Sequence, residues 1–266
     1  MHSTYILTHR GLEPSKLDFY PESTYDAFKD QLSRGFGIEF DPNFTEEEIL
    51  VWHDATFKRA KGKIPTLYEV LNLIRNSSSE INALHFKGKY QNSENIELLV
   101  KILKKNSDIL HKILIFDVKP ETAKILLKFF PNIKLAPSIA HPYDIKRYNS
   151  AISDTLIGIN EALEMVKNGT FGKSPWVWLD EWDLEDTQGK NKKLYTKDVF
   201  DMFHKAGTRI ALVTPELHGT SPGLYGGESH PDSKDLPTLF IRIKEILSLQ
   251  PDAICTDYPE EVLRLI

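Results

Sequence analysis

Short apolar runs alternate with amphipathic stretches along almost the whole chain. Each run is rich in Ile, Val, Phe or Trp and is bounded by polar residues or by Gly and Pro, which is typical of β-strands. The eight runs are TYILTH (4–9), FGIEFD (36–41), NALHFK (82–87), KILIFDV (112–118), IKLAPSI (133–139), WVWLDEW (176–182), RIALVT (209–214) and DAICTD (252–257).

The stretches between these runs carry helical periodicity. Thr66 and Glu69 form a capping-box pattern ahead of the segment LYEVLNLI, which predicts a helix start. Repeated strand–helix alternation without linker-like composition predicts a (β/α)₈ TIM barrel that spans residues 1–266 as one domain. An open doubly wound sheet is the alternative. It is disfavoured because no Gly-rich phosphate fingerprint follows the first run.

Composition narrows the class of protein. The chain has 266 residues, 41% of them hydrophobic, and a formal net charge of −5 without a dominant basic stripe, which argues against a nucleic-acid partner. No apolar run approaches the roughly 20 residues that span a bilayer, so we expect no integral membrane association. The start of the chain lacks a signal-peptide pattern, and we expect a cytoplasmic protein. The single cysteine, Cys255, lies in an apolar run and is expected to be a buried packing residue.

Two carboxylates at the end of the second run suggest a metal site. Glu39 and Asp41 occupy alternate positions of a predicted strand and therefore share one face. Neighbouring carboxylates repel each other unless a cation lies between them or one of them is protonated. Oxygen ligands at this spacing suit Mg²⁺ or Ca²⁺, and the carboxyl end of a barrel strand is where such ligands are expected.

Histidines and cations also lie at the ends of apolar runs. His9 ends the first run, and His53 follows the short apolar segment ILVW (49–52). A histidine pair can divide the roles of general base and general acid. Arg10 is a forked cation suited to phosphate oxygens. His85 and Lys87 share one face of the third run, where burial is costly unless an anion is bound.

These charges have two explanations. Lys87 could simply pair with Glu39 or Asp41, which would leave Arg10 and the histidines without a role. A divalent ion shared with a phosphate would use all of them. Phosphodiester cleavage needs such a set, because cations neutralise the transition state while a base and an acid move protons. The expected partner is therefore a small-molecule phosphodiester.

The chain resembles the glycerophosphodiester phosphodiesterase family. The order of the motifs is specific, the middle of the chain matches loosely, and the last motif extends the resemblance over most of the length. The motifs are HRG (9–11), PEST (21–24) with AF (27–28), IEFD (38–41), VWHD (51–54) and CTDYPEEV (255–262).

The resemblance implies a metal-dependent enzyme with a TIM-like barrel. The family attacks phosphorus with the substrate's neighbouring hydroxyl, and water opens the cyclic phosphate to release glycerol 3-phosphate and an alcohol. The family roles that the resemblance implies are an acid–base pair at His9 and His53, metal ligands at Glu39 and Asp41, phosphate contacts at Arg10 and Lys87, and a bracing carboxylate at Glu22.

One departure concerns the metal. The family generally has a glutamate ligand where this chain has His85. His85 could ligate the metal itself and shift its preference toward softer ions than Ca²⁺, with Mn²⁺ or another ion as candidates. Alternatively, Asp180 or Glu181 supplies the missing carboxylate, or metal binding is lost.

Three functions follow from these patterns. The first is hydrolysis of glycerophosphodiesters. The second is hydrolysis of a lysophospholipid or another phosphodiester, because His85 and the segment VTPELHG (213–219) depart from the family pattern. The third is a barrel that binds phosphorylated ligands without catalysis. The sequence does not specify the alcohol moiety or the oligomeric state.

Overall fold

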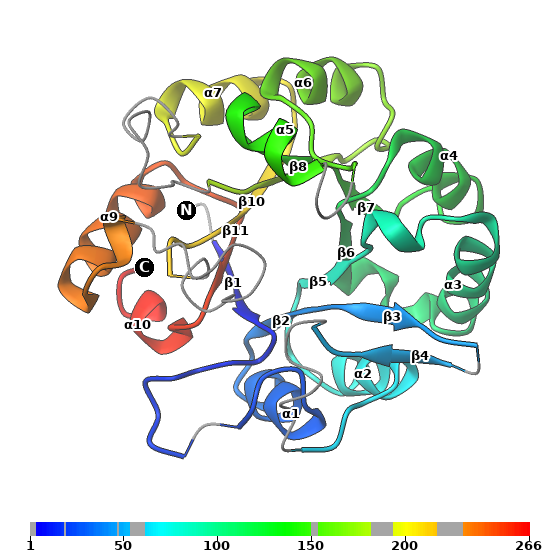
Figure 1. Ribbon diagram of the computed structural model, residues 1–266, viewed down its shortest axis with the longest axis horizontal. Helices are drawn as coiled ribbons and strands as arrows, with labels where there is room; N and C mark the ends of the chain where they lie inside the picture. Colours follow the sequence, from blue (N-terminus) through cyan, green and yellow to red (C-terminus); the bar gives the residue numbers. More distant parts are fainter. Residues whose placement is uncertain are drawn as a thin grey trace.

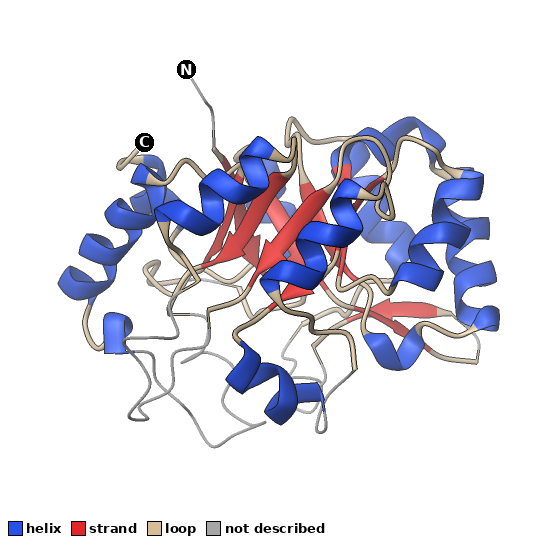
Figure 2. Cartoon of the chain, turned by 90° about the horizontal axis from the view of Figure 1, so that it is seen from above, coloured by secondary structure: helices blue, strands red, loops and turns tan. Residues whose placement is uncertain are grey.

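Parallel β-strands form a central ring that helices surround (Figure 1), and a view turned by 90° shows the strands in the middle of the molecule with helices around them (Figure 2). The computed structural model describes residues 4–18, 20–46, 48–53, 62–149, 154–181, 194–216 and 231–266. Neighbouring strands of the main sheet are parallel, in the order β7-β6-β5-β2-β1-β11-β10-β9-β8. The predicted TIM barrel is confirmed.

Each predicted run contains a barrel strand, and one of the runs is split in two. Only Pro137 separates β7 from β8, and proline cannot donate to a strand ladder. Its carbonyl still accepts a hydrogen bond from Trp178 N at 3.0 Å. Because β7 pairs with β6 and β8 with β9, the two halves act as one strand that closes a ring of eight. The strands are β1 (Tyr5–His9), β2 (Gly37–Phe40), β5 (Asn82–His85), β6 (Ile113–Phe116), β7 (Lys134–Ala136), β8 (Ser138–Ile139), β9 (Trp176–Leu179), β10 (Arg209–Val213) and β11 (Ala253–Thr256).

The helices follow the strands as expected for this fold. The predicted capping box is present at the start of α2, where Thr66 accepts from Glu69 N and the Glu69 carboxylate accepts from Thr66 N. Among the described residues, no helix combines the length and apolar composition needed to cross a bilayer. The helices are α1 (Tyr25–Ser33), α2 (Leu67–Arg75), α3 (Ser93–Lys105), α4 (Pro120–Phe129), α5 (Pro142–Asn149), α6 (Ile159–Lys167), α7 (Lys197–Lys205), α9 (Leu236–Ser248) and α10 (Pro259–Leu263), with the 3-10 segments η2 (Gly88–Tyr90), η3 (Ser107–Lys112) and η5 (Pro231–Ser233).

A small antiparallel ribbon extends from the end of β2. It consists of β3 (Pro42–Phe44) and β4 (Ile49–Val51) and lies beside the ring, next to α2 (Figure 1). The ribbon returns the chain to the barrel mouth, where Trp52 N donates to Asp41 O at 3.1 Å. It therefore places His53 beside the end of β2.

Two apolar layers fill the molecule because successive side chains of a strand point to opposite faces. Ile38 and Phe40 belong to a large cluster that includes residues of the surrounding helices. Leu7, Trp178 and Cys255 belong to a second cluster whose members come from the strands or from the residue just before β5. This second cluster fills the barrel interior, and it confirms Cys255 as a buried packing residue.

The inward-facing positions lead directly to the polar groups. Gly37 occupies one of them, where a Cβ atom would lie 2.0 Å from the carbonyl oxygen of Ile81, so only glycine fits. Two residues further on, the same face of β2 presents Glu39, which lies beside His9 in the strand register. His85 likewise follows Ala83, which lies beside Glu39. The alternation thus brings polar side chains together at the carboxyl end of the barrel.

Candidate active site

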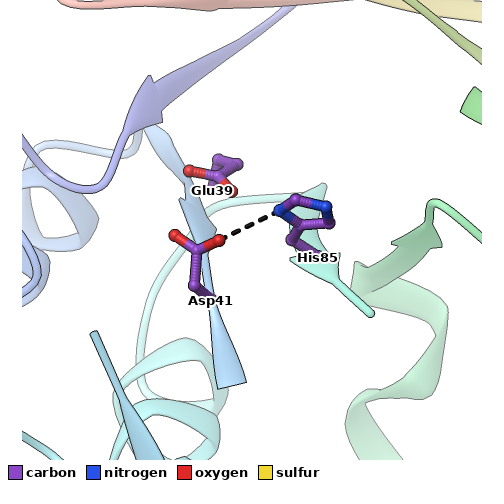
Figure 3. A group of neighbouring side chains, drawn as sticks. All are labelled: Glu39, Asp41 and His85. Atoms are coloured by element: carbon purple, nitrogen blue, oxygen red, sulfur yellow. Dashed lines mark hydrogen bonds and ion pairs between the residues drawn. The ribbon is translucent and has the colours of Figure 1, made fainter. Parts of the chain in front are cut away.

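Glu39, Asp41 and His85 converge at the carboxyl ends of β2 and β5 (Figure 3). Each residue offers one potential ligand atom, and these atoms all lie within 4.8 Å of one another. The two carboxyl groups are buried, and the His85 side chain is about one quarter exposed, at 27%. The structure thus brings together the three residues for which the sequence predicts metal ligation.

Asp41 is surrounded by positive groups. Its Oδ1 lies 3.0 Å from His85 Nδ1 and 3.2 Å from Lys87 Nζ, and its Oδ2 lies 3.8 Å from Arg10 Nε. Burial alone would raise the pKa of Asp41. Lys87, His53 and His85 outweigh burial and hold this pKa well below its usual range. Asp41 is therefore a permanent carboxylate, and Lys87 does pair with it.

Glu39 lacks such compensation. Burial, followed by repulsion from Asp41, raises the pKa of Glu39 to about 8, although Arg10, His85 and Lys87 act in the opposite direction. Its Oε2 is buried and has no hydrogen-bond partner among the described residues. A divalent cation would relieve both the repulsion and the unsatisfied oxygen, so this donor set of two carboxylates and one imidazole fits a metal ion.

His85 lies between two carboxylates. Its Nδ1 faces Asp41, and its Nε2 lies 3.3 Å from Oδ2 of Asp117, at the end of β6. Burial would lower the pKa of His85, but the hydrogen bonds to Asp117 and Asp41 outweigh burial and raise this pKa to about 9. Asp117 was not predicted as a site residue. Its only signal in the sequence is an acidic residue at the end of an apolar run.

His9 has a different environment at the end of β1. Its Nδ1 donates to Oδ1 of Asp257 at 3.3 Å. Burial, followed by the charge of Arg10, lowers the pKa of His9 to about 3, so the ring is neutral at physiological pH. Asp257 belongs to the quoted CTDYPEEV motif, but its role was not predicted from the sequence.

His53 is also a neutral imidazole. Burial, followed by Arg10, lowers the pKa of His53 to about 2. Asn43 holds the chain just before His53, because its Nδ2 donates to Asp41 O at 3.0 Å and to Trp52 O at 2.5 Å. Tyr90 in turn donates to Asn43 Oδ1 at 2.8 Å. Asp54, the last residue of the quoted VWHD motif, lies outside the described residues.

Arg10 is buried in a tight turn at the end of β1. Its Nη1 donates to Oε2 of Glu22 at 3.0 Å, which agrees with the predicted bracing carboxylate. Ser23 N donates to Arg10 O at 2.8 Å, and both residues have positive φ, 58° and 54° respectively. Gly11 follows with a φ of 72°, and a Cβ atom there would lie 3.0 Å from the carbonyl carbon of Ala27 in α1. The close approach of the backbone at Gly11 is therefore to a helix.

Asp180 and Glu181 are the substitute metal ligands that the sequence offers. Glu181 has other partners, because its Oε1 lies 3.1 Å from Nη2 of Arg242 and its Oε2 accepts from Tyr195 N at 2.7 Å. Burial, followed by Asp144, raises the pKa of Asp180 well above its usual range, although His85 acts to lower it. Neither residue belongs to the metal-ligand group described above.

Most of the connections after β9 and β10, residues 182–193 and 217–230, lies outside the described residues. The described start of the second one contains Glu216. Its Oε1 accepts from the hydroxyls of Thr214 at 2.5 Å and Thr256 at 2.6 Å and from Asp257 N at 3.1 Å. Burial, followed by repulsion from Asp257, raises the pKa of Glu216 to about 7. Glu216 thus accepts a hydrogen bond from the backbone of Asp257, the aspartate that faces His9. The sequence analysis did not single out Glu216.

Three solved structures with the same fold span nearly the whole chain. A candidate glycerophosphodiester phosphodiesterase from Galdieria sulphuraria is 17% identical, with a TM-score of 0.63 over 98% of this chain and 97% of that chain. A phosphodiesterase from Oleispira antarctica, solved in complex with the product sn-glycerol-3-phosphate, is 16% identical, with a TM-score of 0.62 over 98% and 96%. A dihydropteroate synthetase is 9% identical, with a TM-score of 0.52 over 98% and 91%.

The sequence comparisons are negative, since neither protein-family models nor curated proteins give a match. The structural similarity nevertheless confirms, for the fold, the resemblance that the sequence motifs indicate. A synthetase among the similar structures shows that this fold supports more than one chemistry. The activity therefore depends on the side chains of the site and not on the fold alone.

Proposed function

We propose that this chain is a phosphoric diester hydrolase that converts glycerophosphodiesters to glycerol 3-phosphate and an alcohol. One observation carries the proposal: two neutral histidines, His9 and His53, lie in the field of buried Arg10, next to the Glu39–Asp41–His85 group. The similar phosphodiesterase structures, one of them with bound sn-glycerol-3-phosphate, support this substrate class.

Glu39, Asp41 and His85 would hold a divalent ion, Mg²⁺ or Ca²⁺ or a softer ion such as Mn²⁺. Such an ion neutralises charge on the phosphoryl oxygens and orients the phosphate. Arg10 and Lys87 would bind the same phosphate, since both cations are buried at the barrel mouth. Their present carboxylate partners, Glu22 and Asp41, hold them in place.

The two imidazoles would move the protons. A neutral ring accepts a proton, so either His9 or His53 can act on the attacking hydroxyl of the substrate while the other, once protonated, donates to the leaving alcohol. The negative phosphodiester favours this protonation, because it offsets the charge of Arg10 that lowers both pKa values. Asp257 would orient His9 and stabilise its protonated form.

A substrate panel tests the proposal. Glycerophosphocholine, glycerophosphoethanolamine and a lysophospholipid are each assayed with Mg²⁺, Ca²⁺, Mn²⁺ or chelator. We expect turnover of the glycerophosphodiesters, loss of turnover with chelator, and a drop of about 10²- to 10⁴-fold in His9→Ala and His53→Ala. His111→Ala is the matched control, because His111 is exposed at the amino end of β6.

Other outcomes would reassign the function. Turnover of the lysophospholipid alone would favour the second candidate, which the departure at position 85 motivates. Thermal stabilisation by glycerol 3-phosphate without turnover with any ion would indicate a phosphate-ligand-binding barrel. A single domain over residues 1–266, a cytoplasmic location and the lack of a nucleic-acid partner are part of the proposal.

A further inference from the structure

His85 forms the centre of a row of three side chains that joins the ends of three strands. Its Nδ1 faces Asp41 at 3.0 Å and its opposite ring nitrogen, Nε2, faces Asp117 at 3.3 Å. Both aspartates are buried, at 1% and 5% exposure. Asp117 therefore lies on the side of the ring away from the carboxylates of β2, outside the metal-ligand group.

The backbone of Asp117 is held in an uncommon conformation. Its φ is 66°, in the left-handed region that non-glycine residues rarely adopt and that concentrates at functional sites. Gln91 fixes this turn, because its Nε2 donates to Asp117 O at 2.6 Å and to Phe86 O at 2.7 Å. Lys119 N donates to Gln91 Oε1 at 2.9 Å and completes the clamp. The carboxylate is thus held rigidly against His85.

Aromatic stacking fixes the plane of the same imidazole. The rings of His85 and Phe116 stack with centroids 4.5 Å apart and an angle of 15°. Phe116 stacks in turn on Trp178, at 3.9 Å and 12°. With the ring plane set by stacking and Nε2 set by Asp117, only Nδ1 points toward Glu39 and Asp41.

We propose that Asp117 is a positioning residue that presents His85 Nδ1 as a metal ligand, and that it thereby makes the site prefer imidazole-binding ions such as Co²⁺ and Zn²⁺ over Mg²⁺. The inference rests on the metal site of the proposed function. Metal-bound histidines commonly donate their other ring N–H to a carboxylate, which fixes the tautomer and raises ligand basicity. Imidazole suits Zn²⁺ and similar ions, whereas Mg²⁺ is bound mainly by oxygen.

Metal titrations in the absence of substrate test the inference. Chelator-treated protein is titrated calorimetrically with Co²⁺, Zn²⁺ and Mg²⁺, and the visible absorption of bound Co²⁺ is recorded as a report on nitrogen ligation. We expect wild type to bind Co²⁺ at least 10²-fold more tightly than Mg²⁺. Asp117→Asn should weaken Co²⁺ binding by about 10- to 100-fold while changing Mg²⁺ binding by less than about threefold, and it should alter the Co²⁺ spectrum.

Two further variants separate positioning from folding. His85→Glu should reverse the preference toward Mg²⁺, and adding Asp117→Asn to it should no longer weaken Co²⁺ binding if Asp117 acts through His85. Asp201→Asn, a change at a partly exposed residue on α7, is the matched control and should leave every affinity unchanged. Thermal unfolding in chelator identifies any variant that has lost its fold.

Three results would overturn the inference: equal wild-type affinity for Co²⁺ and Mg²⁺, an equal loss for both ions in Asp117→Asn, or no loss for either. An equal loss would mean that Asp117 is a direct ligand or a structural residue. These results do not depend on turnover. If no glycerophosphodiester is cleaved but the metal preference is as stated, the proposed function fails and the positioning role stands.

Discussion

The two sides of the barrel mouth shift the pKa values of their histidines in opposite directions. On the side of β1 and the β3–β4 ribbon, His9 and His53 have pKa values lowered to about 3 and about 2. On the side of β5, His85 has a pKa raised to about 9. All three lie close to the same buried charges. Burial lowers the pKa of each ring, so burial cannot be what distinguishes them.

The difference comes from what faces the ring nitrogens. His85 has a carboxylate at each nitrogen, and together they outweigh burial. Arg10 lowers the pKa of both other rings, and the aspartate that faces His9 does not compensate for this charge and for burial. One fold thus keeps two imidazoles free to accept protons and holds a third in a fixed orientation. Neighbouring charges, and not residue type, assign the roles.

Replacing Arg10 should have the largest effect on the difference between the histidines of the two sides. In Arg10→Met we expect the pKa values of His9 and His53 to rise, because a nearby positive charge no longer opposes protonation. The acidic limb of the pH–rate profile should move to higher pH. kcat/KM should fall by about 10²- to 10³-fold through loss of phosphate stabilisation.

Arg10→Lys is the matched control for charge. It should keep the acidic limb near its wild-type position while losing part of the rate, because lysine lacks the guanidinium fork that can donate to Glu22 and to phosphate oxygens together. An unshifted acidic limb in Arg10→Met would show that Arg10 does not set the protonation of the two histidines.

Asp257→Asn sharpens the comparison on the His9 side alone. The amide keeps the shape of the carboxylate but cannot stabilise a protonated His9 through Nδ1. We expect kcat to fall by about 10²-fold with little change in KM, at the lower end of what a positioned acid or base contributes. Steady-state kinetics check this split. A rise in KM at unchanged kcat would assign Asp257 to substrate binding and remove it from proton transfer.

Glu216→Gln tests whether Glu216 keeps a proton in the folded state, beside Asp257 on the His9 side of the barrel mouth. The pKa of Glu216 in the fold is about 7, above its ordinary value of 4.5, so between these pH values the folded state keeps a proton that the unfolded state has lost. Wild-type stability should therefore fall as pH rises from 4.5 to 7, by roughly 3 kcal/mol at most. The glutamine variant should lack this contribution.

Urea unfolding at pH 5 and pH 8 measures the effect, since the difference in unfolding free energy between the two proteins should change with pH. Identical pH dependence in wild type and Glu216→Gln would mean that Glu216 is ionised throughout. The orientation of Asp257 would then depend on a charged neighbour.

The sequence predicted the barrel well because its signals are local. Each strand is an apolar run with polar ends, and side-chain alternation alone placed Glu39 and Asp41 on the inner face. The split at Pro137 and the β3–β4 ribbon were not predicted. The first depends on which neighbour each half pairs with, and the second is a short pairing between segments with little periodicity.

The supporting residues of the site were harder to predict because they act across strands. Asp117, Asp257 and Glu216 are single acidic residues at strand ends, and such residues are common without any function. Their roles depend on distances between β5 and β6, between β1 and β11, or between β10 and β11, that no local pattern contains. The opposite pKa shifts of His9 and His85 are likewise set by neighbours far away in the sequence.

The smallest expected effect concerns the hydrogen bonds of Tyr90 and Asn43, which hold the chain just before His53. Tyr90→Phe removes the hydrogen bond to Asn43 but leaves the two bonds from Asn43 to the backbone of Asp41 and Trp52. One lost hydrogen bond is worth about 1 kcal/mol, so we expect a loss of stability of that size and a fall in kcat of a few-fold at unchanged KM.

Tyr68→Phe provides the matched control for the hydroxyl, because Tyr68 is 61% exposed on α2. It should change neither stability nor kcat. If Tyr90→Phe loses stability while kcat stays at the wild-type value, the Tyr90 hydroxyl supports the ribbon without setting the position of His53. His53 would then owe its placement to the bonds that this variant keeps, those from Asn43 Nδ2 to Asp41 O and Trp52 O and the one from Trp52 N to Asp41 O.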